Sequence, residues 1–380
     1  MRKAYLIFLV IISTAILYPQ GQKFDSTVTA GIKQIYDIKF SEAERTFGGL
    51  IKKYPDKPQG KFFYAMVDWW KIMLDPDNEK YDDEFIDKLD SVIDQCDEIL
   101  DKDEDNLDAV FFKGGALGFR GRLRAFRESW FKAASDAREA LPLVEKAAKL
   151  DPKNIDVQLG FGIYDYYAAI IPDNYPVVKP LMLFLPSGNK QRGLKELKNV
   201  AENGRYAKYE ARYFLMSLYY IHEDNPYEAV NYARMLTKDF PDNPVFERWL
   251  GRIYAKRGNF ARASEIFKDV LHKADENFKG YKVFNAMRES AYYVGYEFKE
   301  INKLDSAAYF FQKCIDYSKQ IDKKETSGFQ INSLLYLGNI NDMWGNRPVA
   351  VAYYKKLLDL REYGNSHSLA EKYLKKPYSK

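Results

Sequence analysis

The sequence predicts an all-α solenoid in which about eight helix pairs stack along one continuous core. Three observations predict it. Residues 244–274 carry the complete pattern of a two-helix repeat, and a small residue recurs along the chain at intervals near that repeat's length. Prolines also follow the predicted second helices, where one helix ends and the next begins.

The clearest repeat lies at residues 244–274. Within it Gly251 on the first helix and Ala263 on the second let the two backbones approach closely, because Gly lacks a Cβ atom and Ala carries only a methyl group. Larger side chains fill the space between this pair and its neighbours. The pattern closely resembles a tetratricopeptide repeat (TPR), and it consists of Phe246, Trp249, Leu250, Gly251, Tyr254, Gly258, Phe260, Ala263, Phe267 and Val270.

The small residue of the second helix locates the other repeats. From Gly193 this small residue recurs after 36 residues and again after 34, which brings it to Ala263. The next two intervals are 44 and 43 residues. A step of 53 residues before Gly193 indicates an insertion, and the long interval after Ala43 accommodates one further repeat at 57–105, with Val92, Cys96 and Ile99 in its core. The positions are Ala43, Ala140, Gly193, Ala229, Ala263, Ala307 and Ala350.

Stop signals agree with these repeats. Tyr54-Pro55, Asp151-Pro152 and Phe240-Pro241 each follow a predicted second helix. Residues 366–374 read as a capping helix over the last pair, with lysines on its outer side. We therefore expect one right-handed TPR-type superhelical domain over residues 23–380.

The N-terminus predicts export. Residues 1–22 comprise Met1-Arg2-Lys3, the apolar run Ala4–Leu17 and a polar end, the pattern of a secretory signal peptide that is cleaved or kept as an N-terminal anchor. No Cys follows the run, so we expect no bacterial lipoprotein anchor. The net charge of +4 falls to +2 without Arg2 and Lys3. A chain this close to neutral is not expected to bind nucleic acid.

Residues that could carry chemistry are scattered. Cys96 and Cys314 fall at core positions several repeats apart and read as small buried hydrophobes, and the three histidines lie in different repeats. The glycines of 114–115 and 160–162 sit inside predicted helices, not between a strand and a helix as a dinucleotide site requires. We expect no metal, no cofactor and no catalysis.

Two segments depart from the repeat pattern. Residues 170–189 hold four prolines around an apolar run at 181–185, which must either pack on the solenoid or dock a partner or a membrane surface. Residues 119–131 interleave arginines with aromatic residues. Here the aromatics read as core and the arginines as a solvated face, with Arg120, Arg124 and Arg127 as an alternative anion-binding set.

The combination of signal peptide and TPR solenoid resembles exported TPR proteins of Gram-negative bacteria. The resemblance implies a periplasmic or outer-membrane-associated scaffold of envelope assembly or secretion, and alternatively a solute or glycan receptor. It also implies that ligands meet the first helices at Tyr166, Tyr167, Phe214, His222, Arg248, Arg252, Lys256, Tyr292, Tyr296, Lys299 and Asn339. This mixed aromatic and basic track would suit a protein or peptide partner with acidic groups.

Overall fold

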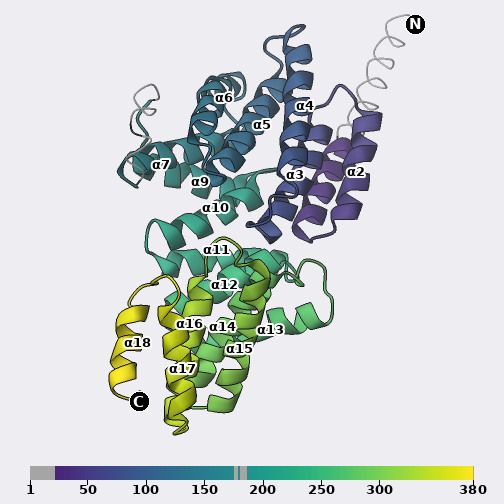
Figure 1. Ribbon diagram of the computed structural model, residues 1–380. Coiled ribbons are helices and arrows are strands. Elements are labelled where there is room, and N and C mark those ends of the chain that lie inside the picture. Colours follow the sequence, from purple (N-terminus) through teal and green to yellow (C-terminus); the bar gives the residue numbers. More distant parts are fainter. Residues whose placement is uncertain (1–21, 175–178, 180–185, 380) are drawn as a thin grey trace, which may run out of the picture. The chain divides into compact units, whose positions relative to one another are not determined.

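The computed structural model describes residues 22–174, 179 and 186–379. Within these residues every regular element is a helix, and the helices pack consecutively as antiparallel pairs (Figure 1). Packing divides the chain into two compact units, the first ending at Leu215 and the second beginning at Met216, inside helix α10. The tetratricopeptide-type α-solenoid predicted from the sequence is confirmed.

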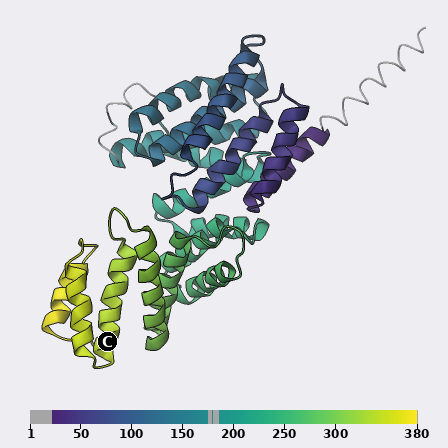
Figure 2. The same ribbon diagram turned by 45° about the vertical axis from the view of Figure 1, so that its right-hand side comes forward.

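The first unit contains four helix pairs in chain order, which Figure 2 shows side by side from purple to teal. A short 3-10 helix, η1 (Ile155–Val157), precedes the fourth pair, and α10 follows it. The pairs are 22–36 with α2 (Phe40–Lys53), α3 (Gln59–Leu74) with α4 (Asp82–Leu100), α5 (Leu107–Phe126) with α6 (Trp130–Leu150), and α7 (Gln158–Asn174) with α9 (Lys190–Asn203).

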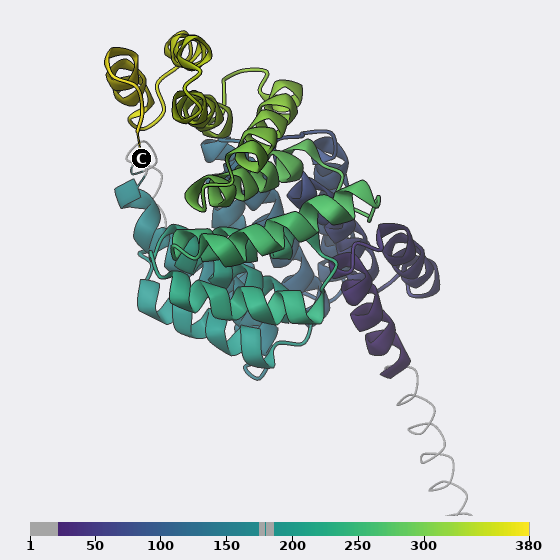
Figure 3. The ribbon, with the colours of Figure 1, turned by 90° about the horizontal axis from the view of Figure 1, so that it is seen from below.

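The second unit begins inside α10 and contains four further helix pairs. Figure 3 shows that the helices of this unit differ in direction: the green helices near its start are seen along their length, and the yellow helices near its end almost end-on. The final helix α18 (Ser366–Lys375) is the expected cap, and its Ala370 is fully buried. The pairs are α10 (Lys208–Ile221) with α11 (Pro226–Asp239), α12 (Pro244–Lys256) with α13 (Phe260–Asp275), α14 (Phe284–Glu300) with α15 (Leu304–Ile321), and α16 (Gly328–Met343) with α17 (Arg347–Leu358).

The close approach expected between paired helices is present in two pairs of the second unit, α12 with α13 and α16 with α17. A Cβ atom added to Gly251 would lie 2.7 Å from a ring carbon of Phe267, and one on Gly338 would lie 2.4 Å from the ring of Tyr354. In both pairs a glycine of the first helix meets an aromatic ring sixteen residues later on the second. Among the described residues the predicted small positions all lie on second helices, and their alanines are all buried.

The remaining punctuation also follows the prediction. Helices α2, α6 and α11 end at Lys53, Leu150 and Asp239, immediately before the three residues that precede prolines. Cys96 and Cys314 are fully buried and free, and burial raises the pKa of each thiol to about 12. Both thiols therefore stay protonated at neutral pH and pack as apolar groups.

A tyrosine-lined pocket as the candidate functional site

In the first unit, the face made by the first helices of its pairs is packed against the chain itself. Helix α10 presents Glu210, whose carboxylate accepts a hydrogen bond from Tyr36 at 3.1 Å and pairs with Arg122 at 2.6 Å. The rings of Trp70 and Tyr213 meet edge to face 5.6 Å apart. Three first helices, 22–36, α3 and α5, thus contact one helix from much later in the sequence.

Arg122 is the centre of this packing. Its guanidinium lies 4.5 Å from the ring centroid of Trp69 and 4.1 Å from that of Phe214. Of the expected partner-binding residues in the first unit, Phe214 and Tyr166 are buried and Tyr167 is half-buried against Tyr166. Side chains predicted to face a ligand here face other helices of the same unit.

The arginines of 119–131 pair with carboxylates of the chain instead of forming a solvated face. Arg120 and Arg124 both donate to Asp136 of α6, at 2.7 Å from Arg120 Nη2 and 2.6 Å from Arg124 Nη1. Arg120 also reaches Asp90, and Arg127 pairs with Asp82 of α4. Each guanidinium is at least partly buried, so an external anion would have to displace a carboxylate that is already bound.

The expectation that the aromatic residues of this segment belong to the core is wrong for two of them. Leu123 is buried as expected, but Phe126 is 45% exposed and Phe131 is 78% exposed. The reason is position: α5 ends at Phe126 and α6 begins at Trp130, so both phenylalanines lie at the turn of the pair. Helical spacing continues through this turn in the sequence, but the helix does not.

In the second unit, two predicted groove arginines are also held internally. Arg248 Nε donates to Glu289 Oε2 at 3.0 Å, and Arg252 Nη2 donates to the same oxygen at 2.8 Å. Burial would raise the pKa of Glu289, but the two guanidiniums lower it below its usual value. Lys256 pairs with Asp224 at 2.7 Å, and His222 is half-buried. The two arginines thus join α12 to α14, the next first helix, and Lys256 joins α12 to the turn between α10 and α11.

Three other predicted residues meet in one pocket of about 380 Å³. Tyr296 and Lys299 of α14 and Asn339 of α16 come from successive first helices, as the expected track requires. The fourth, Tyr292, is not part of the lining but packs on the lining residue Tyr336, with ring centroids 6.3 Å apart. The pocket lining is completed by Asn332, Leu335, Tyr336, Tyr363, Gly364, Asn365, Leu369, Tyr373 and Tyr378.

Lys299 supplies the charge of this pocket. The residue is only 7% exposed, and its ammonium has one carboxylate partner among the described residues, Glu300 at 3.4 Å. Its Nζ also lies 5.1 Å from the ring centroid of Tyr336 and 5.7 Å from that of Tyr378. Ring faces stabilise a desolvated ammonium, but less strongly than a close carboxylate would.

The pocket therefore combines one buried positive charge with aromatic faces and polar groups. Asn339 is buried, and its Oδ1 lies 3.0 Å from the hydroxyl oxygen of Tyr354. Phenol and amide groups can orient a ligand, while rings give rigid contact area. The sequence-based prediction missed the other nine lining residues, although the six tyrosines from Tyr336 to Tyr378 were a visible signal.

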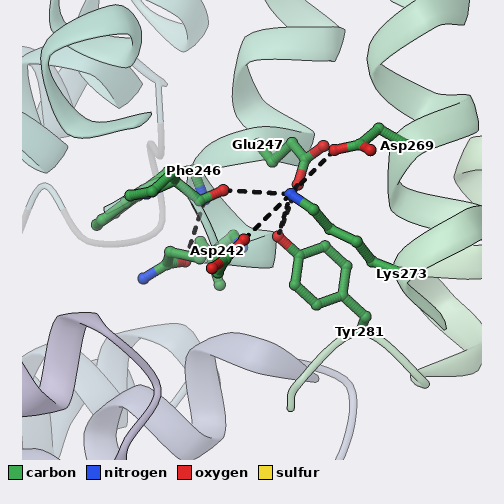
Figure 4. Close-up of polar contacts among 9 residues, drawn as sticks. Asp242, Phe246, Glu247, Asp269, Lys273 and Tyr281 are labelled. Atoms are coloured by element: carbon green, nitrogen blue, oxygen red, sulfur yellow. Dashed lines mark hydrogen bonds and ion pairs between the residues drawn. The ribbon is translucent and has the colours of Figure 1, made fainter. Parts of the chain in front are cut away.

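A second polar cluster lies elsewhere in the second unit. Figure 4 shows Lys273 of α13 among three acids and a tyrosine. Its Nζ is 2.9 Å from Asp269, 3.2 Å from Glu247 and 3.4 Å from Asp242, while the Tyr281 hydroxyl donates to Glu247 at 2.6 Å. Burial and a hydrogen bond shared with Asp269 raise the pKa of Glu247 to about 7.

The raised pKa of Glu247 should make the free energy of unfolding depend on pH. Because the carboxyl of Glu247 has a pKa near 4.5 when unfolded and about 7 when folded, the folded protein holds a proton that the unfolded chain releases between these values. The free energy of unfolding should therefore fall by about 2 kcal/mol from pH 5 to pH 8 through this group. Asp269 does not cancel this effect, because hydrogen bonds to Glu247 and Lys273 outweigh its burial and lower its pKa.

Urea denaturation followed by circular dichroism at pH 5 and pH 8 measures this dependence. Glu247→Gln keeps the hydrogen bonds without the titration, so its pH slope should be flatter than that of the native chain. Glu265→Gln, an exposed change on the same helix α13, should keep the native slope. Identical slopes for the native chain and Glu247→Gln would show that Glu247 does not titrate in this window.

The fold class agrees with comparisons to known proteins. No protein-family model matches the sequence, and no curated protein does. Among solved structures, a chain of the APC/C hetero-tetramer Cut9–Hcn1 is similar over 88% of this chain and 52% of that chain, with 11% identity and a TM-score of 0.50. This chain thus spans about half of that one. The likeness assigns the protein to the TPR-type α-solenoids by fold.

Two smaller solved proteins are also similar. PilW, described as a type IV pilus biogenesis factor, has 18% identity over 67% of this chain and 96% of that one, with a TM-score of 0.42. PilF of Pseudomonas aeruginosa has 14% identity over 69% and 97%, with a TM-score of 0.44.

Two predicted segments lie outside the residues that the structure describes. These are the signal-peptide run and the apolar run 181–185. Among the residues that are described, none of the helices has the length and apolar character needed to cross a bilayer. The same part of the chain holds no cluster of three or more His, Cys, Asp or Glu side chains arranged for a metal ion.

Proposed function

We propose that the protein is an exported, non-catalytic scaffold that binds a protein or peptide partner on the first-helix face of its second unit. The signal-peptide pattern of residues 1–22 supports export to the periplasm or to an outer-membrane-associated site. Within that compartment we propose a role in envelope assembly or secretion. Determining the N-terminal residue of the mature protein would test export directly.

One observation carries the proposal. The first-helix face of the first unit is packed against α10, whereas the corresponding face of the second unit holds an open pocket at α14 and α16. A TPR-type solenoid commonly presents this face to its ligands. The pocket unites a buried ammonium with several tyrosines, and tyrosine is among the residues that contribute most to protein interfaces.

The same lining supports one alternative, a receptor for a solute or glycan. Asn332, Asn339 and Asn365 carry amide groups that can donate to and accept from sugar hydroxyls, and tyrosine rings can stack on a sugar face. A pocket of about 380 Å³ falls within the range that small ligands fill. Peripheral membrane association is compatible with either function.

Site-specific photo-crosslinking in cells separates these functions. A photo-reactive residue placed at Tyr363, which lines the pocket and is 46% exposed, should capture one recurrent protein. The matched control is Tyr309 on the second helix α15, which is 57% exposed and lies outside the pocket. The same products at both positions, or no protein product at Tyr363, would contradict the scaffold and direct the search to glycans and organic anions.

A further inference from the structure

The pocket already contains a side chain from the segment that follows α18. Helix α18 ends at Lys375, and Tyr378 then turns back to line the pocket together with Lys299 and Tyr373. The three neighbours of Tyr378 in this segment, Lys376, Pro377 and Ser379, are exposed. Only Tyr378 is inserted.

The insertion uses one backbone hydrogen bond and one aromatic ring. The backbone N–H of Tyr378 donates to Asp342 Oδ2 at 2.8 Å. Its ring lies 5.2 Å from that of Tyr373 and 5.7 Å from the ammonium of Lys299. An extended peptide is recognised through the same two features, a main-chain hydrogen bond that holds its backbone and a pocket that selects its side chain.

The groups that hold Tyr378 are themselves held rigidly. Asp342 is fully buried at its side chain and also pairs with Arg347 at 2.9 Å and accepts from the hydroxyl of Tyr354 at 2.9 Å. Arg347 in turn donates to the carbonyl oxygens of Tyr373 and Leu374, both at 2.7 Å, which caps the end of α18. A peptide therefore meets an acceptor that is already oriented, and little freedom is lost on binding.

By contrast, the segment 376–379 is attached weakly. Apart from the bond of Lys376 to the last turn of α18, the hydrogen bond to Asp342 is the one that holds this segment among the described residues. Pro377 has no N–H to donate. Because the attachment is local and small, the segment can leave the pocket while α18 stays packed on the last pair.

We infer that the pocket binds an extended peptide through an aromatic side chain placed over Lys299, and that Tyr378 is its internal competitor. This inference rests on the proposed scaffold function and specifies that the site recognises an aromatic side chain of the partner. A partner would supply a tyrosine or phenylalanine in place of Tyr378 and a backbone N–H for Asp342. Its neighbouring residues would lie along Tyr363 and Asn365.

The test uses the full chain and a synthetic peptide of residues 372–379, Lys-Tyr-Leu-Lys-Lys-Pro-Tyr-Ser, with a fluorescent label. Fluorescence anisotropy should show binding to Tyr378→Ala that is about tenfold tighter or more than binding to the native chain, because the competitor is gone. The same peptide with its residue 378 changed to alanine should bind neither chain. Adding Lys299→Met to Tyr378→Ala should weaken binding at least tenfold.

Two results would overturn the inference. One is equal affinity of the peptide for the native chain and for Tyr378→Ala, and the other is no binding to a Tyr378→Ala chain that keeps the native circular dichroism spectrum. Tyr309→Ala serves as the control for removing a tyrosine outside the pocket, and should bind the peptide as the native chain does. The probe is the chain's own segment, so peptide binding without any protein captured at Tyr363 would refute the scaffold function and leave the peptide site standing.

Discussion

Replacing Gly193 with alanine should lower the free energy of unfolding of the first unit by about 3 kcal/mol. A Cβ atom at this position on α9 would lie 2.7 Å from the carbonyl oxygen of Gly162 and 2.8 Å from the backbone nitrogen of Tyr166. Both atoms belong to the backbone of α7. No side chain can rotate away to make room, so the two helices themselves must separate.

Gly118→Ala is the matched control for this experiment. Gly118 lies inside α5, is exposed, and has no atom within 4 Å of an added Cβ. Alanine there should raise stability by about 0.5 to 1 kcal/mol, since glycine is a poorer helix former. Denaturant unfolding followed by circular dichroism compares the two variants, and equal stabilities would show that α7 and α9 do not need close contact.

The second large effect is expected at Glu289. Glu289→Ala should destabilise the second unit by about 3 to 5 kcal/mol, because it leaves two arginines without their carboxylate. Arg248 is only 6% exposed, so its charge cannot turn to water. Arg252 is less buried, with 28% of its side chain exposed, and keeps some solvation.

The control removes an acid that also pairs with an arginine but lies in solvent. Glu265 pairs with Arg262 on the surface of α13, and both side chains are more than half exposed. Glu265→Ala should change the free energy of unfolding by at most about 0.5 kcal/mol. A loss at Glu289 no larger than the loss at Glu265 would mean that the buried ion pair does not stabilise α12 against α14.

The fold was predictable because its determinants are local. The clearest helix pair is marked within one repeat by a glycine, a small residue and an aromatic ring, namely Gly251, Ala263 and Phe267. Prediction was wrong where the pattern runs through a turn, as at Phe126 and Phe131. Periodicity alone does not show where a helix stops.

The candidate site was predictable only in part. Tyr296, Lys299 and Asn339 were placed on the first-helix face by repeat position, and the structure brings them into one pocket. Arg248 and Arg252 were placed on the same face, yet they are engaged by Glu289, which lies about forty residues away in the sequence. A repeat register shows which way a side chain points but not which charge meets it.

The order, pairing and core of the helices follow from the amino-acid sequence, because neighbouring residues decide where two helices can touch. Which first-helix face stays open does not follow from it. That choice depends on contacts such as Tyr36 with Glu210, 174 residues apart, and on Tyr378 folding back to Lys299. Such contacts depend on the small rotations that successive helix pairs add to the solenoid. A repeat pattern in the sequence does not specify these rotations.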